Sequence, residues 1–126
     1  MSIETLKSVA ATLVEYCKTQ QEDKGLAQLY APDAVSAEAV AMGDTPREVA
    51  GMEALRGKHA WWEENFEVHG GGVEGPFFHG EDRFAVIFDV DATNKASGER
   101  SQMREVAIYT LNADGKIARE EFFYGF

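Results

Sequence analysis

Residues 83–93, RFAVIFDVDAT, decide the fold of this chain. Two sets of side chains alternate along the stretch, with Phe84, Val86, Phe88 and Val90 in one set and Ala85, Ile87, Asp89 and Asp91 in the other. A period of two is typical of a β-strand that has one face in the core. Turn-forming residues stand on both sides, at 79–82 and 94–98, so the strand is expected to have antiparallel neighbours.

The neighbouring strands are expected at 67–77, 100–111 and 116–124. The first of them contains GGGVEG at 70–75, which matches the phosphate-binding pattern G-x-G-x-x-G. This tract leads into Pro76 and a strand, so it offers phosphate no helix N-terminus. Glycines inside a strand predict a bulged, bent backbone instead.

The N-terminal half is expected to be mostly helical. Apolar residues at helical spacing predict helices over 3–20 and 51–66, and Asp23 is expected to cap a short helix between them. Pro32 should end that short helix, and strands are expected at 34–42 and 47–50. Helices on one face of an antiparallel sheet define an α+β fold, which we expect to form a single domain over residues 1–126.

The charge balance and the cysteine count exclude several classes of function. The 22 Asp and Glu residues outnumber the 12 Lys and Arg residues, and the formal net charge is −10. Such a chain repels phosphate backbones, so no nucleic acid is expected as a partner. Cys17 is the single cysteine, and the three histidines lack ligand spacing, so we expect no disulfide and no metal. Without a long apolar run or a signal peptide, we expect a cytoplasmic protein that binds no membrane.

A second pattern is the order of three segments: LYAPDAV at 29–35, GMEALRG at 51–57 and YTLNADGKI at 109–117. Together they resemble the nuclear transport factor 2-like superfamily, in particular its SnoaL-like members. The resemblance implies a cystatin-like cone, in which three N-terminal helices pack on a strongly twisted antiparallel sheet that encloses an apolar pocket. It also implies a homodimer through the outer sheet face and no cofactor. Because this fold hosts isomerases, cyclases, dehydratases and non-catalytic binders, it does not define the function.

Glu38 is the first candidate for acid–base chemistry. It follows Tyr30 by eight residues, and the steroid isomerases of the superfamily that the chain resembles carry their general-base aspartate at the matching place. A carboxyl there can move a proton next to a carbonyl if burial raises its pKa toward neutrality. The alternative is a solvated glutamate on a strand.

The last hairpin supplies further carboxylates. A tight turn at 112–115 predicts that Ala107 pairs with Glu120 and that Glu105 pairs with Phe122. By analogy with the isomerases, the residues that face the pocket are then Glu105, Tyr109, Glu120, Phe122 and Tyr124. Glu120 is the better catalytic candidate of the two glutamates. In the alternative register, slipped by one residue, all of these side chains face water.

The helices and the central strand add further candidates. Tyr16 lies near the place where the steroid isomerases keep an oxyanion-binding tyrosine, and its alternative role is that of a core tyrosine. His59 is a catalytic candidate on the apolar face of the third helix, and its alternative role is a hydrogen-bonded residue at the rim. Aromatic walls for a ligand are expected from Trp62, Phe84 and Phe88.

At two places the chain differs from the isomerases and cyclases that it resembles, so the resemblance does not decide its function. Ala107 stands where the isomerases carry a second oxyanion acid, and the chain runs into 125–126 where the cyclases carry an aspartate. Neither mechanism therefore transfers intact. The leading hypothesis is a cofactor-free enzyme that acts on a small hydrophobic or carbonyl-containing molecule. The alternatives are a non-catalytic binder of such a molecule and a dimeric interaction module.

Overall fold

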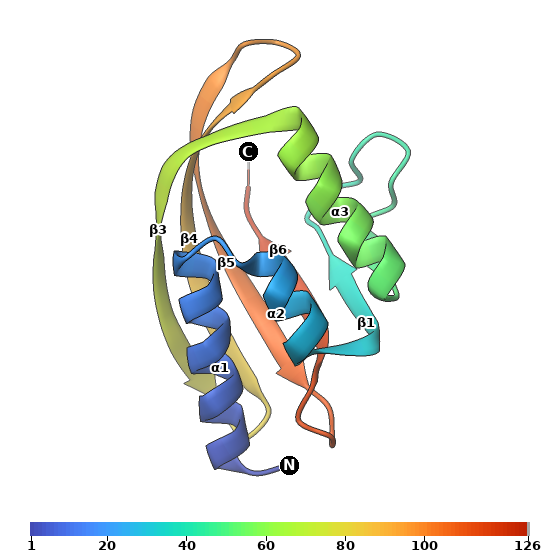
Figure 1. Cartoon of the computed structure of the whole chain (residues 1–126), viewed down its shortest axis with the longest axis vertical. Helices are drawn as coiled ribbons and strands as arrows, with labels where there is room; N and C mark the ends of the chain where they lie inside the picture. The colour runs from blue at the N-terminus through green and yellow to red at the C-terminus, as the bar shows by residue number, and fades with distance from the viewer. Residues whose placement is uncertain (126) are drawn as a thin grey trace.

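The computed structural model describes residues 1–125 and consists of a six-stranded sheet with three helices on one side of it (Figure 1). Sequence and structure agree on the α+β class and on the order of the elements. These are α1 (Ile3–Lys18), α2 (Glu22–Leu29), β1 (Tyr30–Ala37), β2 (Glu48–Ala50), α3 (Met52–Asn65), β3 (Phe66–His79), β4 (Arg83–Asn94), β5 (Arg100–Leu111) and β6 (Ile117–Phe123).

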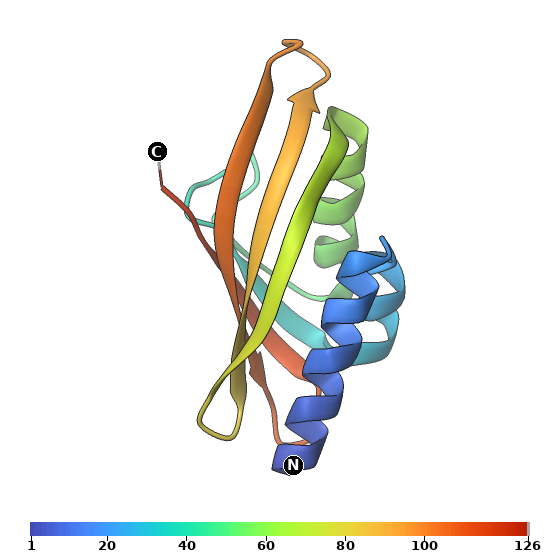
Figure 2. The same ribbon diagram turned by 90° about the vertical axis from the view of Figure 1, so that its left-hand side faces the viewer.

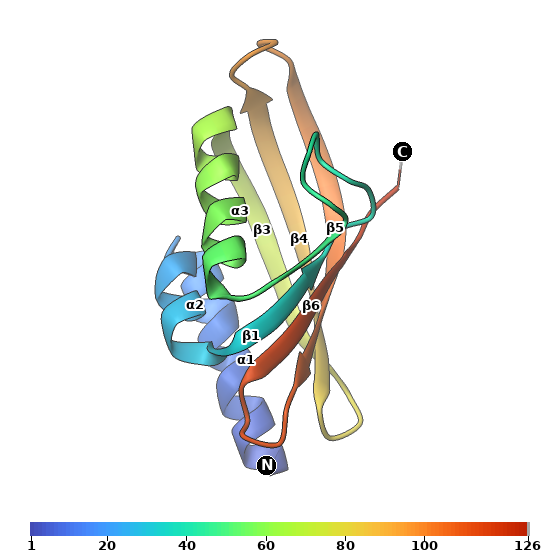
Figure 3. The same ribbon diagram turned by 90° about the vertical axis from the view of Figure 1, so that its right-hand side faces the viewer.

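The strands follow the order β2-β1-β6-β5-β4-β3 across the sheet. Strands β1 and β6 pair in parallel, whereas the other pairs within residues 1–125 are antiparallel. The parallel pair corrects the prediction of a purely antiparallel sheet. A parallel pair needs a long crossover, and most of the chain separates these two strands. The sheet curls so that its concave face lies against the helices (Figure 2 and Figure 3).

The first strand begins earlier than the sequence predicted. Helix α2 ends at Leu29 and β1 begins at Tyr30, so Pro32 lies inside a strand rather than just beyond a helix. The register between β1 and β6 shifts between Tyr30 and Val35, and this irregularity accommodates a residue that cannot donate a backbone hydrogen bond. The N-cap of α2 is Gln21, and not Asp23 as predicted.

The core lies between the concave face of the sheet and the helices. Its fully buried side chains include Leu6 of α1, Leu55 of α3 and Phe84 of β4. Along the helix-covered face of β5, Tyr109 and Ala107 are buried, whereas Glu105 is only partly buried. Burial therefore decreases from the Tyr109 end of the sheet toward the Glu105 end, where a site can open.

The glycine tract forms bulged strand β3, as predicted. The pairing of β3 with β4 shifts register between Val68 and Gly70 and again between Glu74 and Phe77. The tract leads into further strand rather than into a helix, so it has no helix N-terminus for phosphate.

The last hairpin pairs differently from the prediction, although the same side chains face the core. Tyr109 pairs with Glu120, and Ala107 pairs with Phe122, which is a shift of two residues from the predicted pairs. Leu111 pairs with Ile117 rather than with Lys116, which gives one residue of the shift, and an irregularity between Thr110 and Leu111 adds the other. Because side chains alternate with a period of two, a shift of two leaves each residue on its predicted face.

Candidate functional site

Lys58 lies at the centre of a polar cluster on the helix-covered side of the sheet. It projects from α3, and its side chain is only 14% exposed. The Nζ atom donates a 2.7 Å hydrogen bond to Ser36 Oγ of β1 and lies 3.3 Å from Glu38 Oε2. It also lies 5.4 Å from the centre of the Phe122 ring, within cation–π range. Helix α3 thus brings one positive charge to the strands that carry the predicted acids.

Glu38 follows β1 and is bound to the polar cluster through this lysine. Its side chain is 13% exposed. Burial raises the pKa of the Glu38 carboxyl, while the Lys58 ammonium and a hydrogen bond from Tyr124 act in the opposite direction. Within residues 1–125, Oε2 is buried with the ammonium as its ion-pair partner and makes no hydrogen bond of good geometry. Its geometry is therefore that of a counter-ion to Lys58.

Glu120 is the most deeply buried of the three acids and is 3% exposed. It lies on β6 opposite Ser36 of β1 and Tyr109 of β5. The buried Tyr30 hydroxyl donates a hydrogen bond to Glu120 Oε2. Burial raises the pKa of both tyrosine hydroxyls, Tyr30 and Tyr109, and the Glu120 charge raises it further. Both phenols consequently stay neutral, and Tyr30 is the one that donates to this carboxylate.

Glu105 differs from the other two acids because its carboxyl has no hydrogen bond or ion pair within residues 1–125. It lies on β5 opposite Phe88 of β4. Burial raises its pKa to about 7, with a further rise from Glu38 and an opposing effect of Lys58. A carboxyl that titrates near neutrality and is not engaged by the protein can both accept and return a proton at physiological pH.

Three other predicted residues make their contacts with helices or with β3. The Tyr16 hydroxyl donates a 2.6 Å hydrogen bond to Gln28 Oε1 of α2. His59 Nδ1 lies 3.5 Å from the exposed Asp23 carboxylate of α2. The Trp62 ring stacks on Phe66 at a centroid distance of 4.3 Å. None of these three contacts involves Glu38, Glu105 or Glu120.

The two predicted phenylalanines of β4 occupy different environments. Phe84 is fully buried and stacks on Tyr109 with ring centres 5.0 Å apart, so this ring is part of the core. Phe88 is partly buried, packs against the core and pairs with Glu105. Phe88 is thus adjacent to the carboxyl that has no partner.

An open cavity of about 530 Å³ borders the polar cluster. It lies where β1 and β6 end and β2 begins. Three of the predicted site residues line it, namely Glu38, Phe122 and Tyr124. Its other lining residues include Arg47, Glu48, Arg119, Glu121 and Phe123, so this cavity is more polar than the pocket that the sequence predicted. The last three alternate with Glu120 along β6, so the cavity extends onto the sheet face without helices.

The sequence analysis did not identify Lys58, Ser36 or Tyr30 as site residues. Helical spacing could have suggested Lys58, which stands three residues after the buried Leu55. Alternation could have suggested Ser36, because it stands two residues before Glu38 on the same strand. The hydrogen bond between Tyr30 and Glu120 joins residues from opposite ends of the chain, and no local pattern indicates it.

The family model of the SnoaL-like domain matches residues 4–124, and the chain belongs to this family. A crystal structure of a proposed SnoaL-like polyketide cyclase from Mesorhizobium loti is 42% identical, with a TM-score of 0.87, and the match covers 94% of this chain and 98% of that one. Among proteins of curated function, none matches this chain.

More distant structures share the fold. An NTF2-like protein of unknown function from Burkholderia pseudomallei is 15% identical, with a TM-score of 0.73 and coverage of 99% of this chain and 92% of that one. The Mycobacterium tuberculosis protein RV0760c, solved in complex with estradiol-17β-hemisuccinate, is 20% identical, with a TM-score of 0.67 and coverage of 100% and 96%.

Two other features can be assessed over the described residues, namely membrane-spanning helices and metal sites. No helix within residues 1–125 is long and apolar enough to cross a membrane. In the same part of the chain, no three or more His, Cys, Asp and Glu side chains are grouped so that they could hold a metal ion.

Proposed function

We propose that this protein is a cofactor-free enzyme that moves a proton next to the carbonyl group of a small, partly hydrophobic molecule, as an isomerase or a cyclase does. The observation that carries the proposal is Glu105, a partly buried carboxyl without a partner and with a pKa of about 7. A general base is most effective when its pKa lies near the working pH.

Among the acids, Glu105 fits the role of the proton carrier best. Glu38 is held as the counter-ion of Lys58, and Glu120 accepts the Tyr30 hydrogen bond at 3% exposure. A base must be free to approach the substrate, whereas these two carboxylates are already bound to protein groups. In this proposal Glu38 and Glu120 raise the pKa of Glu105 through their negative charges and do not contact the reacting carbon.

The proton transfer conserves all atoms and electrons. Glu105 carboxylate takes a proton from the carbon next to the carbonyl, the C–H electrons form a C=C bond, and the C=O π electrons move onto oxygen. The protonated carboxyl then returns the proton to another carbon of the same enolate, and the carbonyl forms again. No oxidant or reductant is needed, and the base is regenerated.

The related structures support a ligand of moderate size. RV0760c was solved with estradiol-17β-hemisuccinate, and another protein with this fold is a computationally designed 17-OHP binder. The aromatic side chains that we propose as contacts are Trp62, Phe88, Phe122 and Tyr124. Such rings provide apolar contact area with few rotatable bonds.

Replacing Glu105 with glutamine is expected to lower kcat/KM by about 10²–10⁴-fold, the usual contribution of a general base. A suitable probe is 3-cyclohexen-1-one, whose isomerisation to the conjugated enone is followed by ultraviolet absorbance. Wild-type activity should rise with pH through about 7, because the carboxylate is the active form and burial raises its pKa. The Glu105 carboxyl carbon should titrate in the same range by ¹³C NMR.

Glu99→Gln is the matched control for this experiment, because Glu99 is exposed, stands just before β5 and does not line the cavity. Full activity in Glu105→Gln would contradict the proposal. Binding of the ketone to the wild-type protein without any turnover would favour the non-catalytic binder instead.

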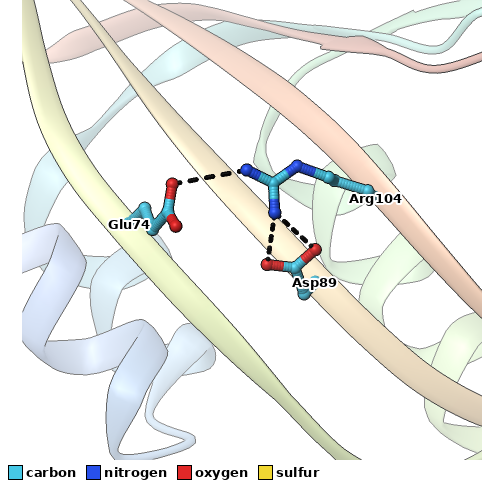
Figure 4. A network of polar contacts seen from close by, with 3 residues as sticks. All are labelled: Glu74, Asp89 and Arg104. Atoms are coloured by element: carbon cyan, nitrogen blue, oxygen red, sulfur yellow. Dashed lines mark hydrogen bonds and ion pairs between the residues drawn. The ribbon is translucent and has the colours of Figure 1, made fainter.

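We also propose that two copies associate through the sheet face that carries no helices. Phe77 and Phe123 are 51% and 50% exposed, and the register joins them to partly buried apolar neighbours across four strands, Ala85, Ile87, Val106 and Ile108. Arg104 binds Asp89 and Glu74 at one flank of this face (Figure 4). Both signs of charge at the flank suit contact with a second copy of the same surface.

Phe123→Lys is expected to raise the dimer dissociation constant by about 30-fold or more, since a central aromatic residue often contributes at least ~2 kcal/mol at an interface. Sedimentation velocity over a concentration series measures the effect. Trp61→Lys is the control, because Trp61 is 42% exposed but lies on α3. A wild-type protein that stays monomeric over the whole series would rule this interface out.

A further inference from the structure

Within residues 1–125, Lys58 is the one cation whose side chain pairs with one of the three acids, and the proton transfer proposed above gives it no role. We propose that Lys58 is a further catalytic residue, whose ammonium stabilises the negative charge that develops on the substrate's carbonyl oxygen. The inference rests on the proposed function, because that charge arises when Glu105 removes the carbon-bound proton.

The ammonium has donors left for a substrate. A lysine ammonium carries three N–H groups. One is donated to Ser36 Oγ at 2.7 Å, and the contact with Glu38 Oε2 at 3.3 Å is an ion pair without hydrogen-bond geometry. Ser36 is fully buried, so this bond fixes the position of the nitrogen. The Lys58 ammonium would thus already be held in place when one of its N–H groups donates to a substrate oxygen.

The ammonium also contacts residues that line the cavity, and one of them pairs with the strand that carries the proposed base. Of the three side chains that it contacts, Glu38 and Phe122 line the cavity of about 530 Å³, and Phe122 pairs with Ala107, two residues from Glu105 on β5. Its charge acts on the Glu105 carboxyl as well, whose pKa it lowers. A substrate between Glu105 and Lys58 would therefore have its carbon acid near the base and its oxygen near the cation.

A positively charged hydrogen-bond donor would stabilise an enolate oxygen in this site better than a neutral donor. Three carboxyls act on each other here, and each ionised acid disfavours an enolate nearby. A fixed ammonium in a partly buried site stabilises a developing oxyanion without reorganising at the moment of reaction. The substrate class that follows is an enolisable ketone whose oxygen becomes fully anionic.

Binding of 4-nitrophenol tests this role without any turnover. Its phenolate resembles an enolate, and the phenolate absorbs visible light whereas the phenol does not. Two variants form the comparison, Glu38→Gln and Lys58→Met/Glu38→Gln, which differ only in the ammonium. In the first, the ammonium keeps its hydrogen bond to Ser36 but loses its counter-ion, and in the second neither position carries a charge. At a pH below the pKa of free 4-nitrophenol, the first should bind the phenolate at least ~10-fold more tightly than the second.

Equal phenolate binding by the two variants would overturn the assignment, and so would binding of the neutral phenol alone by Glu38→Gln. Circular dichroism of both variants verifies the fold before the titration. Glu105→Gln should keep its phenolate binding, because that residue moves the proton and does not hold the oxygen. If Glu105→Gln isomerises the ketone normally while the Lys58 difference persists, the proposed base fails and the oxyanion role of Lys58 stands.

Discussion

Lys58→Met is expected to lower the free energy of unfolding by about 3–5 kcal/mol, the usual cost of removing one partner of a buried ion pair. Both side chains of the pair with Glu38 are less than 15% exposed, at 14% and 13%. Without the ammonium, Glu38 keeps its burial but loses its counter-ion, and Ser36 loses a donor. Urea unfolding followed by circular dichroism measures the change.

The double variant Lys58→Met/Glu38→Gln should recover a large part of this loss, because the remaining amide carries no charge into the buried site. Lys24→Met is the control, since Lys24 is exposed and its ammonium lies 5.2 Å from the Tyr16 ring rather than in an ion pair. A Lys58→Met protein as stable as the wild type would show that water reaches the pair and screens it.

Gly71→Ala is expected to lower the free energy of unfolding by about 3 kcal/mol, at the upper end of the usual cost of overpacking. A Cβ atom on Gly71 would lie 1.9 Å from the Asp89 carbonyl oxygen of the neighbouring strand. The obstacle is backbone that belongs to the β3–β4 ladder, so it cannot turn away as a side chain can. Guanidinium unfolding measures the loss.

The neighbouring glycines provide matched controls for this experiment. A Cβ on Gly70 would meet nothing within 4 Å, and a Cβ on Gly72 would lie 3.8 Å from the Asp89 side chain, which is an ordinary contact. Gly70→Ala and Gly72→Ala should therefore change stability far less than Gly71→Ala. Equal losses at the three positions would mean that the contact of the new Cβ with the Asp89 carbonyl oxygen is not the cause.

The sequence predicted the elements because their signals are local. Alternation over 83–93 and helical spacing over 51–66 each need only neighbouring residues, and the structure has β4 and α3 at these places. The end of α2 was harder to predict, because Pro32 was interpreted as a helix stop. Pairing with β6 instead continues the strand from Tyr30 through an irregularity at the proline.

Local sequence patterns could predict only part of the candidate site. The faces of Glu105 and Glu120 could be predicted, since a two-residue shift of register preserves the face. What distinguishes the two acids is their partners. Glu120 is bonded to Tyr30, ninety residues away along the chain, whereas Glu105 has no partner within the described residues.

The α+β class and the order of helices and strands could be predicted from the sequence, because periodicity and turn chemistry are properties of short segments. Tertiary structure alone decided the parallel pairing of β1 with β6, the contact of Lys58 with Glu38 and Ser36, and the raised pKa of Glu105. Burial and charge depend on distances between segments that are remote in sequence, and only the packing of α3 against the curled sheet sets those distances.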